Sequence, residues 1–565
     1  MPIIGIDLGT TNSLVSCVID NECVIIPNAL NESKTPSVVS VLDNDEIIVG
    51  SAAKERLITH PQHTAAAFKR YMGTNKKYTL GKYTFTPTEL SSFVLRSLKA
   101  DAEAFLGTQI TEAVISVPAY FNDQQRRATK QAGELAGLKV ERLINEPTAA
   151  AVSYGLHQSG DEKQFLVFDL GGGTFDVSIL DFFDNIFEVK AVAGNNFLGG
   201  EDFDQCLIDY FLKRNNIDKY DLDLKAMSIL KKLAEKCKIS LSNSDSYSLN
   251  YTINGQDYDL AISNSEFEAI SKDLLIKLKQ PLLKAFRDSN MYTHDLDEII
   301  LVGGSTKMPL IRSFAAKYFG RLPLCSLNPD EIVALGAGIY AAMKERNEFF
   351  KETVLTDVCP YTLGVEVVTF NEFGEIEDGH FLPIIERNTT VPFSKVKRLY
   401  NVFDYQRAIN VSVYQGESRL VENNIKLGEL ELYVPPAPRG KSAVDVRYTY
   451  DINGILEVEV TSVATGEKKR KVILRNDCTL TDEEVEARLK ELEEIKIHPR
   501  ENAKSKYLLA KAERLYEETL SDLRLMIAKA IQHFESVLER QNPEEVKSES
   551  LKFEAFLNKI EDWEN

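Results

Sequence analysis

The segments IGIDLGTTNS (4–13) and LVFDLGGGTFDV (166–177) repeat one pattern at two distant points of the chain. In each segment, an apolar run leads into an aspartate, a glycine-rich turn and a second apolar run. This pattern predicts two strands joined by a tight turn. A single turn of this kind would be typical of ordinary structure, but two matched hairpins predict a duplicated domain that holds a nucleotide between its halves.

Glycine-rich turns between strands place several backbone N–H groups around one point, where they can bind phosphate oxygens. The candidate residues of the two turns are Gly9, Thr10, Thr11 and Asn12, followed later by Gly171, Gly172, Gly173, Thr174 and Asp176. Asp7 and Asp169 precede the turns and would repel a polyphosphate. Because Mg²⁺ prefers a few carboxylates together with water and phosphate oxygens, the two aspartates predict a metal ion between them.

Other segments fit the same cleft. The strand in ILVGGSTKMP ends at Gly303 and Gly304, where a ligand can approach the backbone closely. Glu235, Lys238 and Ser242 fall on one face of a predicted helix, and that face could bind a ribose and an adenine. A solvated helix surface is the alternative for these three residues.

The segment NPDEIVALGAGIYAA (328–342) predicts a helix with Asn328 as its N-cap and Pro329 at its first position. One face of this helix carries only small residues. We therefore expect it to pack closely against a neighbouring element.

Composition and charge exclude several classes of protein. The chain has 565 residues, enough for about two to four domains. Its net charge of −19 argues against a general nucleic-acid or anionic-membrane binder. No apolar run reaches the roughly 18 residues of a membrane span, and no basic leader precedes the first strand, so we expect neither a membrane segment nor a secretory signal. Seven scattered cysteines without a CxxC motif predict a reduced, cytosolic chain.

Three zones of different composition follow one another. The first alternates β-rich and helical stretches, which is typical of α/β layers. The second has short strands with hairpin turns at Asn453-Gly454 and Thr465-Gly466, which predicts a β-sandwich. The third is helical, with an apolar stripe at Leu523, Ile527, Ala530, Phe534 and Leu538 that predicts packing between helices. The predicted domains are 1–350, a linker at 351–359, the β zone at 360–478 and the helical zone at 479–565.

The motifs GIDLGTTNS, VISVPAYFNDQQRRAT, NEPTAAA, FDLGGGTFDVS, LGGEDFD and LVGGSTKMP resemble, in order and approximate spacing, those of the 70-kDa heat-shock protein chaperones. The resemblance covers nearly the whole chain. It implies an actin-like ATPase domain with two ribonuclease-H-like halves, a β-sandwich peptide-binding domain and a short α-helical lid. It also implies an ATPase that binds ATP or ADP with Mg²⁺, with K⁺ as a further candidate, and that binds extended apolar segments of unfolded polypeptides.

The resemblance also implies roles for single residues. Lys69 would lie beside the γ-phosphate and position the attacking water. Thr174 would contact the γ-phosphate. Glu146 and Asp176 would order the water and the ligands around the metal. Asp7 and Asp169 would hold Mg²⁺ through water. Phosphoryl transfer to water needs positioning and charge neutralisation more than a strong base, which this set provides. The remaining implied nucleotide contacts are Gly199, Gly200, Glu201, Glu235, Lys238, Ser242, Gly303, Gly304, Ser305, Lys307 and Asp330.

Residues outside the nucleotide cleft match positions that serve communication and partners. Pro118 and Arg126 match the pair that relays the nucleotide state to the linker. Arg142, Asn145 and Asp357 match positions where J-domain cochaperones dock. The residues that match the peptide cleft are Leu363, Val365, Val367, Val368, Leu399, Val402, Ile409 and Val411. Ordinary packing in the core of the sandwich is the alternative for these eight side chains.

The chain departs from the family pattern at several points. Lys307 and Ile239 replace arginines on the adenine side, and lysine does not stack flat on a base as a guanidinium does, so looser nucleotide binding is expected. Thr353 and Thr356 make the linker less apolar and predict altered coupling between domains. Two segments that exchange factors grip are short, which leaves the exchange factor open. About 85 residues follow the β zone, so we expect a shortened lid.

Two other functions remain as alternatives on the residues alone. A small-molecule kinase or a filament-forming ATPase of the same fold would also hold a nucleotide between two halves. Both alternatives leave residues 360–565 without a role. These features make the chain most similar to a specialised bacterial member of the chaperone family, and we expect a bacterial cytoplasmic protein.

Overall fold

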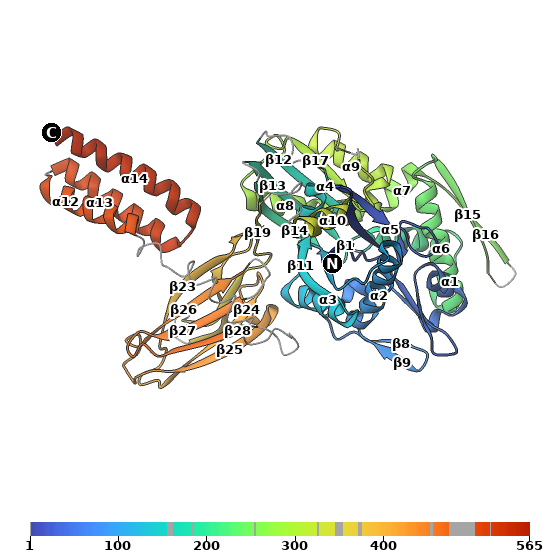
Figure 1. Cartoon of the computed structure of the whole chain (residues 1–565), viewed down its shortest axis with the longest axis horizontal. Helices are drawn as coiled ribbons and strands as arrows, with labels where there is room; N and C mark the ends of the chain where they lie inside the picture. Colours follow the sequence, from blue (N-terminus) through green and yellow to red (C-terminus); the bar gives the residue numbers. More distant parts are fainter. Residues whose placement is uncertain are drawn as a thin grey trace. The chain divides into compact units, whose positions relative to one another are not determined.

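The computed structural model describes residues 2–154, 162–183, 186–253, 256–324, 327–344, 354–370, 376–451, 456–473, 503–519 and 521–564. The chain divides into two compact units, Met1–Pro360 and Tyr361–Asn565, which are described one at a time (Figure 1). None of the helices in the described ranges combines the length and the apolar character that a bilayer span requires.

The first unit contains two large sheets that share the order of four strands, β10-β1-β2-β3 in one and β17-β12-β13-β14 in the other. In the first sheet the strand order is β11-β10-β1-β2-β3, and in the second it is β17-β12-β13-β14-β18. Each sheet contains an antiparallel hairpin, β1–β2 or β12–β13, and a later strand that pairs in parallel with the first hairpin strand. The predicted duplication is therefore confirmed at the level of strand order. The strands are β1 (Ile4–Asp7), β2 (Asn12–Ile19), β3 (Glu22–Ile26), β10 (Glu112–Val117), β11 (Lys139–Asn145), β12 (Lys163–Leu170), β13 (Phe175–Phe183), β14 (Ile186–Asn195), β17 (Glu298–Val302) and β18 (Val354–Leu355).

Helices and small strands complete the two halves, which we call the first half and the second half after their sheets. The helices are α1 (Ser51–Thr59), α2 (Pro87–Leu106), α3 (Asp123–Leu135), α4 (Glu146–Ser153), α5 (Gly200–Arg214), α6 (Leu224–Ser240), α7 (Asn264–Ile270), α8 (Lys272–Ser289), α9 (Pro309–Phe319) and α10 (Ile332–Lys344), with short 3₁₀ turns η1 (Pro61–His63), η2 (Phe68–Tyr71), η4 (Lys219–Asp221) and η5 (Gly304–Lys307). The small strands are β4 (Thr35–Pro36), β5 (Val38–Val41), β6 (Ile47–Val49), β7 (Thr64–Ala66), β8 (Tyr78–Leu80), β9 (Tyr83–Phe85), β15 (Ser246–Ile253), β16 (Gln256–Ser263) and β19 (Asp357–Val358).

Three hydrophobic clusters make this unit a layered structure. One cluster packs α2 and α3 against the first sheet, and another packs α5, α6, α8 and α9 against the second sheet. The third cluster lies between the sheets and is built around α4 and α10. Burial of these apolar side chains supplies the main stabilising free energy and fixes where the two hairpin turns lie.

The structure corrects one predicted boundary and confirms the packing of the same helix. Helix α10 begins at Ile332, not at Pro329, because residues 329–331 form a turn. Gly303 N donates to Pro329 O at 3.0 Å, which ties this turn to the end of β17. A Cβ atom on Gly336 would lie 1.9 Å from Ala149 O, so the expected close packing is real.

The second unit contains a β-sandwich, as predicted. One sheet has the order β21-β20-β24-β25 and the other has the order β23-β26-β27-β28. The Tyr448 hydroxyl donates to Gly364 O across the core at 2.8 Å. The hairpin at Gly466 is confirmed, while Asn453-Gly454 lies outside the described residues. The strands are β20 (Leu363–Phe370), β21 (Ile376–Ile385), β22 (Thr390–Val391), β23 (Phe393–Tyr400), β24 (Ala408–Gln415), β25 (Ile425–Tyr433), β26 (Ala443–Tyr450), β27 (Leu456–Ser462) and β28 (Lys468–Ile473).

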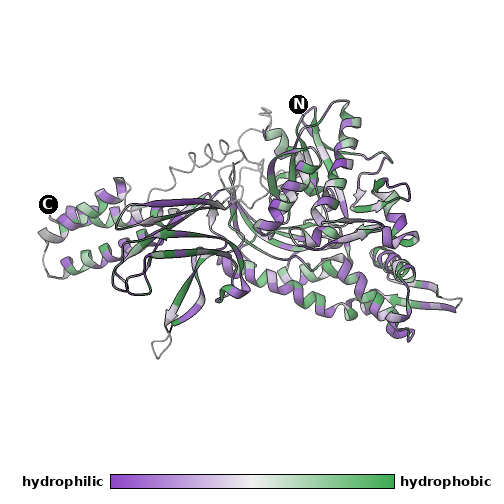
Figure 2. Ribbon diagram, turned by 90° about the horizontal axis from the view of Figure 1, so that it is seen from below, coloured by the Kyte–Doolittle hydropathy of each residue, from purple (hydrophilic) through white to green (hydrophobic). Residues whose placement is uncertain are grey.

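The described C-terminal helices are α12 (Ala503–Glu518), α13 (Ser521–Arg540) and α14 (Pro543–Glu564). Hydrophobic and hydrophilic residues alternate along them, as in amphipathic helices (Figure 2). Ile527, Phe534 and Leu538 are buried in the core that these helices share, and Leu523 and Ala530 pack against it. The predicted helical packing is therefore confirmed, and residues 479–502 of the predicted lid lie outside the described part.

Part of the predicted linker is also visible. Residues 351–353 lie outside the described ranges, whereas β18 pairs in parallel with β14 at the edge of the second sheet. Thr356 N donates to Phe187 O at 2.9 Å. The described part of the linker is thus held against the second half of the first unit.

Candidate nucleotide site

A cavity of about 500 Å³ lies between the two hairpin turns. Most of the residues predicted to bind the nucleotide line this one cavity, although they come from both halves of the unit. Those that line it are Asp7, Gly9, Thr10, Thr11, Asn12, Lys69, Glu146, Asp169, Gly171, Gly172, Thr174, Glu235, Lys238, Ser242, Gly303, Gly304, Ser305, Lys307 and Asp330. Those that do not line it are Gly173, Asp176, Gly199, Gly200 and Glu201.

The two turns approach each other so closely that only glycine fits at their contact. A Cβ atom on Gly172 would lie 1.9 Å from Thr11 Oγ1, and one on Gly173 would lie 2.6 Å from Thr10 Cγ2. Thr11 Oγ1 is buried and has no hydrogen-bond partner among the described residues. Buried hydroxyl groups are nearly always hydrogen-bonded, so this one fits a polar ligand between the turns.

Three of the residues that do not line the cavity, Gly199, Gly200 and Glu201, support the second turn. Gly200 N donates to Gly171 O at 3.0 Å, and Glu201 N donates to Gly172 O at 2.9 Å. Gly199 packs directly on the backbone of Gly172. These contacts fix the shape of the turn that carries Gly171–Thr174.

A cluster of charged side chains lines the cavity. Lys69 Nζ lies 2.9 Å from Glu146 Oε1, and the two side chains are only 4% and 9% exposed. Ser116 Oγ donates to Asp7 Oδ1 at 2.7 Å. Burial, followed by the charge of Glu146, raises the pKa of Asp7 to about 6 and also raises the pKa of Asp169 well above its ordinary value. One lysine therefore faces an excess of buried carboxyl groups, which a bound cation would stabilise.

Asp176 adds another acidic group beside this cluster. Its Oδ1 accepts a hydrogen bond from Tyr120 N at 3.1 Å, whereas its Oδ2 is buried without a partner in the described part of the chain. Burial and then Glu146 raise its pKa to about 8. Within the described residues, no group of three or more His, Cys, Asp or Glu side chains is placed to bind a metal directly.

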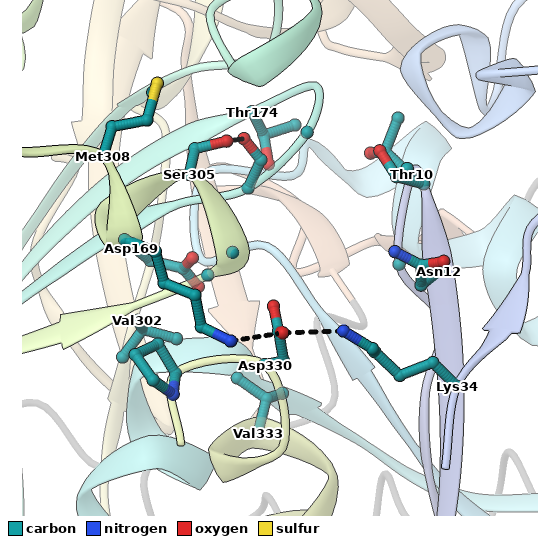
Figure 3. A pocket seen from close by; sticks show the side chains of 18 of the residues that line it. Thr10, Asn12, Lys34, Asp169, Thr174, Val302, Ser305, Met308, Asp330 and Val333 are labelled. Carbon is teal, nitrogen blue, oxygen red and sulfur yellow. Dashed lines mark hydrogen bonds and ion pairs between the residues drawn. The ribbon is translucent and has the colours of Figure 1, made fainter. Parts of the chain in front are cut away.

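A second group of charged side chains lines the same cavity, and Figure 3 shows Lys34 and Asp330 within it. Lys34 Nζ and Lys307 Nζ lie 2.8 and 2.7 Å from the same oxygen of Asp330. Burial opposes ionisation of Asp330, but the hydrogen bonds from Lys307 and Lys34 outweigh it and hold its pKa below the ordinary value. We call these three residues the lysine clip. Lys34 comes from the first half and Lys307 from the second, so the clip joins the two halves.

The sequence did not indicate Lys34, Arg70 or Arg312. Arg70 Nη2 lies 2.7 Å from Asp202 Oδ2, while its Nε, beside the second turn, is buried and unbonded within the described ranges. Arg312 lines the cavity together with Ile239, and its Nε donates to Thr306 O at 3.3 Å. Lys34 belongs to no motif. Arg70 directly follows Lys69, and Arg312 lies one helical turn beyond Met308. The sequence positions of Arg70 and Arg312 beside predicted site residues could therefore have suggested both.

Comparison with known proteins agrees with this geometry. The sequence profile of the family described as "Hsp70 protein" matches residues 3–80 and 75–564. The chain belongs to the Hsp70 family. It is 44% identical over 498 residues to proteins named "Chaperone protein DnaK" from Thermotoga neapolitana, Thermotoga petrophila and Thermotoga maritima, and each match covers 86% of this chain and 82% of the relative. As a member of the Hsp70 family, it is an ATPase and an ATP-dependent chaperone that binds unfolded polypeptides.

In this Hsp70 chain, hydrogen bonds connect the residues beside the cavity to the described part of the linker. Glu146 begins α4, and the residue before it, Asn145, accepts a hydrogen bond from Arg126 Nη2 at 2.7 Å. Asn145 Nδ2 in turn contacts both carboxylate oxygens of Asp357. Pro118 directly follows β10, and Arg126 also donates to Ala119 O at 3.1 Å.

Arg142, which belongs to the predicted J-domain docking residues, lies apart from these hydrogen bonds. The Arg142 guanidinium contacts the Tyr340 hydroxyl of α10 and lies over its ring. Arg142, Asn145 and Asp357 thus all belong to the first unit, and the direct contact that the structure gives within this set joins Asn145 to Asp357.

The predicted peptide-cleft residues of this Hsp70 chain fall into two groups. Those buried in the sandwich are Leu363, Val365, Ile409 and Val411, and those partly exposed are Val367, Val368, Leu399 and Val402. The buried residues alternate along β20 and β24 and face the core. The partly exposed residues lie farther along β20, at the end of β23 or in the loop between β23 and β24.

Proposed function

We propose that the cavity between the two turns is the ATPase site of this Hsp70 chain and that its phosphate end is marked by Lys69, Glu146, Asp7 and Asp169. The observation that carries this proposal is the buried Lys69–Glu146 ion pair, which faces two further carboxyl groups between two glycine-rich turns. Burial of such an ion pair costs desolvation free energy, and interactions with a bound ligand would offset this cost.

In this proposal each residue has a positioning or electrostatic role. Backbone N–H groups of the two turns bind phosphate oxygens, Thr11 and Thr174 add hydroxyl donors, and Lys69 neutralises charge beside the attacking water. Glu146 and Asp176 orient that water as hydrogen-bond acceptors. Asp7 and Asp169 would hold Mg²⁺ through water, and the ion would neutralise phosphate charge during transfer. Glu235, Lys238 and Ser242 lie at the part of the cavity proposed for the nucleoside.

The same proposal assigns the coupling of the two units to Asn145. Glu146 touches Lys69, and its neighbour Asn145 contacts Arg126 and Asp357. A change at the phosphate end therefore reaches the described part of the linker through directly bonded groups. Arg142, Asn145 and Asp357 are the proposed docking residues for a J-domain cochaperone.

The partly exposed residues of the sandwich are the proposed walls of the peptide site. Val368 and Val402 have apolar side chains that water still reaches, as a site for extended apolar segments requires. The lysine in place of an adenine-side arginine favours a specialised bacterial family member similar to chaperone protein HscC. On the likeness to the Thermotoga chaperones, we propose the bacterial cytoplasm as its compartment.

The test compares the wild-type chain with Lys69→Ala in two assays. ATP hydrolysis is measured as phosphate release, and coupling is measured as release of a labelled apolar heptapeptide after ATP and Mg²⁺ are added. We expect Lys69→Ala to lose hydrolysis by about a hundredfold or more and to keep ATP binding. The matched control is Lys82→Ala, which removes an exposed lysine from the same half. Hydrolysis by Lys69→Ala at the wild-type rate would refute the assignment.

A further inference from the structure

We propose that Ser116 positions the Asp7 carboxylate of the ATPase site and thereby sets how tightly that site holds Mg²⁺. In this role Ser116 acts only through Asp7 and touches neither the nucleotide nor the ion. The inference rests on the proposed function, which assigns Asp7 to Mg²⁺ through water.

The first observation is the hydrogen bond between the two side chains. Ser116 Oγ donates to Asp7 Oδ1 at 2.7 Å, a short distance that is typical of a hydroxyl group bound to a carboxylate. Asp7 lines the cavity, whereas Ser116 is not among the residues that line it. The serine thus holds one oxygen of a carboxylate at the cavity wall and leaves the other oxygen, Oδ2, outside this bond.

The second observation is a polar residue in an otherwise apolar part of a strand. Strand β10 has the sequence EAVISV, and every residue from Ala113 to Val117 is buried. Ser116 itself is fully buried. A buried hydroxyl group costs free energy unless it is hydrogen-bonded, so an apolar side chain would suit this position better if packing were the only requirement. The bond to Asp7 accounts for the serine.

The third observation comes from a comparison of the two halves. The parallel pairing of β1 with β10 brings Asp7 beside Ser116, and the parallel pairing of β12 with β17 places Asp169 opposite Val302. Figure 3 shows Asp169 and Val302 at the cavity, and the valine side chain has no hydrogen-bond donor. The duplicated fold therefore does not require a hydroxyl group beside this aspartate, and the serine of the first half points to a role at Asp7.

The coordination chemistry of Mg²⁺ explains why the orientation of this carboxylate matters. Mg²⁺ tolerates little departure from octahedral geometry, so a carboxylate that holds its water molecules must present its oxygens in fixed directions. The last torsion of an aspartate side chain has a broad energy minimum, and the bond from Ser116 restricts it at Asp7. Loss of a group that orients a metal ligand lowers metal affinity by about 10–100-fold. Contact through water places the expected effect at the lower end of this range.

The test measures how much Mg²⁺ the full chain needs to bind a labelled ADP. The fluorescence anisotropy of the label is followed as Mg²⁺ is added, which gives the half-saturating Mg²⁺ concentration without any turnover. We expect Ser116→Ala to raise this concentration about tenfold. The rate of ATP hydrolysis at saturating Mg²⁺ should fall by a smaller factor, because the serine does not touch the reacting groups. A wild-type Mg²⁺ requirement in folded Ser116→Ala would overturn the inference.

A matched pair of variants separates the hydroxyl group from the shape of the side chain. Threonine and valine have nearly the same shape, but only threonine can donate a hydrogen bond to Asp7. Ser116→Thr should keep the wild-type Mg²⁺ requirement, and Ser116→Val should behave like Ser116→Ala. Equal Mg²⁺ requirements in the two folded variants would overturn the inference. Melting temperatures without ligand report folding, and Ser116→Ala, which adds no volume, decides the question if the larger side chains do not fit.

A serine from the other sheet provides the control. Ser178→Ala removes a hydroxyl group that is also fully buried, from β13 of the second half. It should leave the Mg²⁺ requirement unchanged. An increase as large as that of Ser116→Ala would show that any buried hydroxyl group in these sheets has this effect, and would overturn the inference.

Asp7→Asn separates this inference from the proposed function. This variant should itself raise the Mg²⁺ requirement, and Ser116→Ala should then add nothing, because two residues that act through one contact are not additive. A further increase in the double variant would show that Ser116 does not act through Asp7. A wild-type requirement in Asp7→Asn would refute the proposed role of Asp7 and the inference with it. If Asp7→Asn needs more Mg²⁺ but Ser116→Ala does not, the proposed function stands and the inference alone is overturned.

Discussion

The Asn145 amide lies 2.6 Å from both carboxylate oxygens of Asp357, although the two residues are 212 positions apart. Asn145 directly precedes Glu146, the partner of Lys69, and Asp357 lies in the segment predicted to link the two domains. In the proposed function, this contact is the point at which a change in the ATPase site reaches the linker.

Removal of the Asp357 carboxylate should uncouple the two units. In Asp357→Ala, Asn145 loses its charged acceptor, and hydrogen bonds to charged groups contribute about 1.5–3 kcal/mol. We expect peptide release after ATP addition to slow by about tenfold, as a loss of about 1.4 kcal/mol would produce. Stopped-flow release of a labelled peptide measures this rate. Substitution of the exposed Asp221 offers a control, and release at the wild-type rate in Asp357→Ala would show that coupling takes another route.

The raised pKa values of the acidic cluster predict how Mg²⁺ and ADP stabilise the chain at different pH. In the ligand-free folded state the pKa of Asp7 is about 6 and that of Asp176 is about 8, both above the ordinary 3.8. Between these values and 3.8 the folded state binds more protons than the unfolded state, so the free energy of unfolding falls as pH rises. Bound Mg²⁺ offsets the negative charge that causes this loss.

The increase in melting temperature caused by Mg²⁺ and ADP should therefore be larger near pH 8 than near pH 5.5. Differential scanning fluorimetry with and without both ligands measures the difference. Asp176→Asn removes one of the titrating groups and should reduce the pH dependence of the ligand-free chain. An equal or larger ligand effect at the lower pH would contradict the account.

The lysine clip should limit how fast the nucleotide leaves. Asp330→Asn removes the shared carboxylate, so Lys34 and Lys307 repel each other instead of joining the two halves. We expect labelled ADP to dissociate about three to ten times faster, which corresponds to a loss of about 0.6–1.4 kcal/mol. Lys82→Ala, which breaks an exposed ion pair with Asp45, should leave the rate unchanged. A rate in Asp330→Asn no faster than wild type would remove the clip from the release step.

Close backbone packing makes Gly336 sensitive to the smallest substitution. A Cβ atom there would lie 1.9 Å from Ala149 O, so Gly336→Ala must push α10 away from α4. We expect a loss of about 2–3 kcal/mol in the stability of the first unit, measured by denaturant titration. Gly107→Ala meets nothing within 4 Å and has only the cost of its left-handed φ of +65°, about 1 kcal/mol. Equal losses in the two variants would contradict the packing argument.

The sequence predicted those features whose cause is local. The two hairpins follow from apolar runs and glycines within short segments, and Asp7 and Asp169 were found because the turns match. Lys34 was missed because only the fold brings it to Asp330. Tertiary contacts also account for the wrong start of α10. The predicted N-cap at Asn328 is favourable locally. In the structure, however, two lysines hold Asp330 and Gly303 holds Pro329, so these residues form a turn before the helix.

The peptide site shows a different limit. Alternation along β20 and β24 identifies which side chains share a face, and Val365 and Val411 are buried as expected of such a face. Alternation does not distinguish a filled core from an open cleft, because both require apolar side chains at every second position. The loop that carries Val402 is shaped by hydrogen bonds of Asn401 and Gln406 that no local pattern encodes.

Helices α4 and α10 lie between the two sheets and pack directly on each other. These helices approach each other to backbone contact at Gly336 and Ala149, where glycine contributes no side chain. No side chain at this point can change rotamer to absorb a displacement, so movement of one sheet relative to the other would have to shift helix backbone. β18, where the described part of the linker begins, is the edge strand of the second sheet, and a shift of that sheet would carry this part of the linker with it.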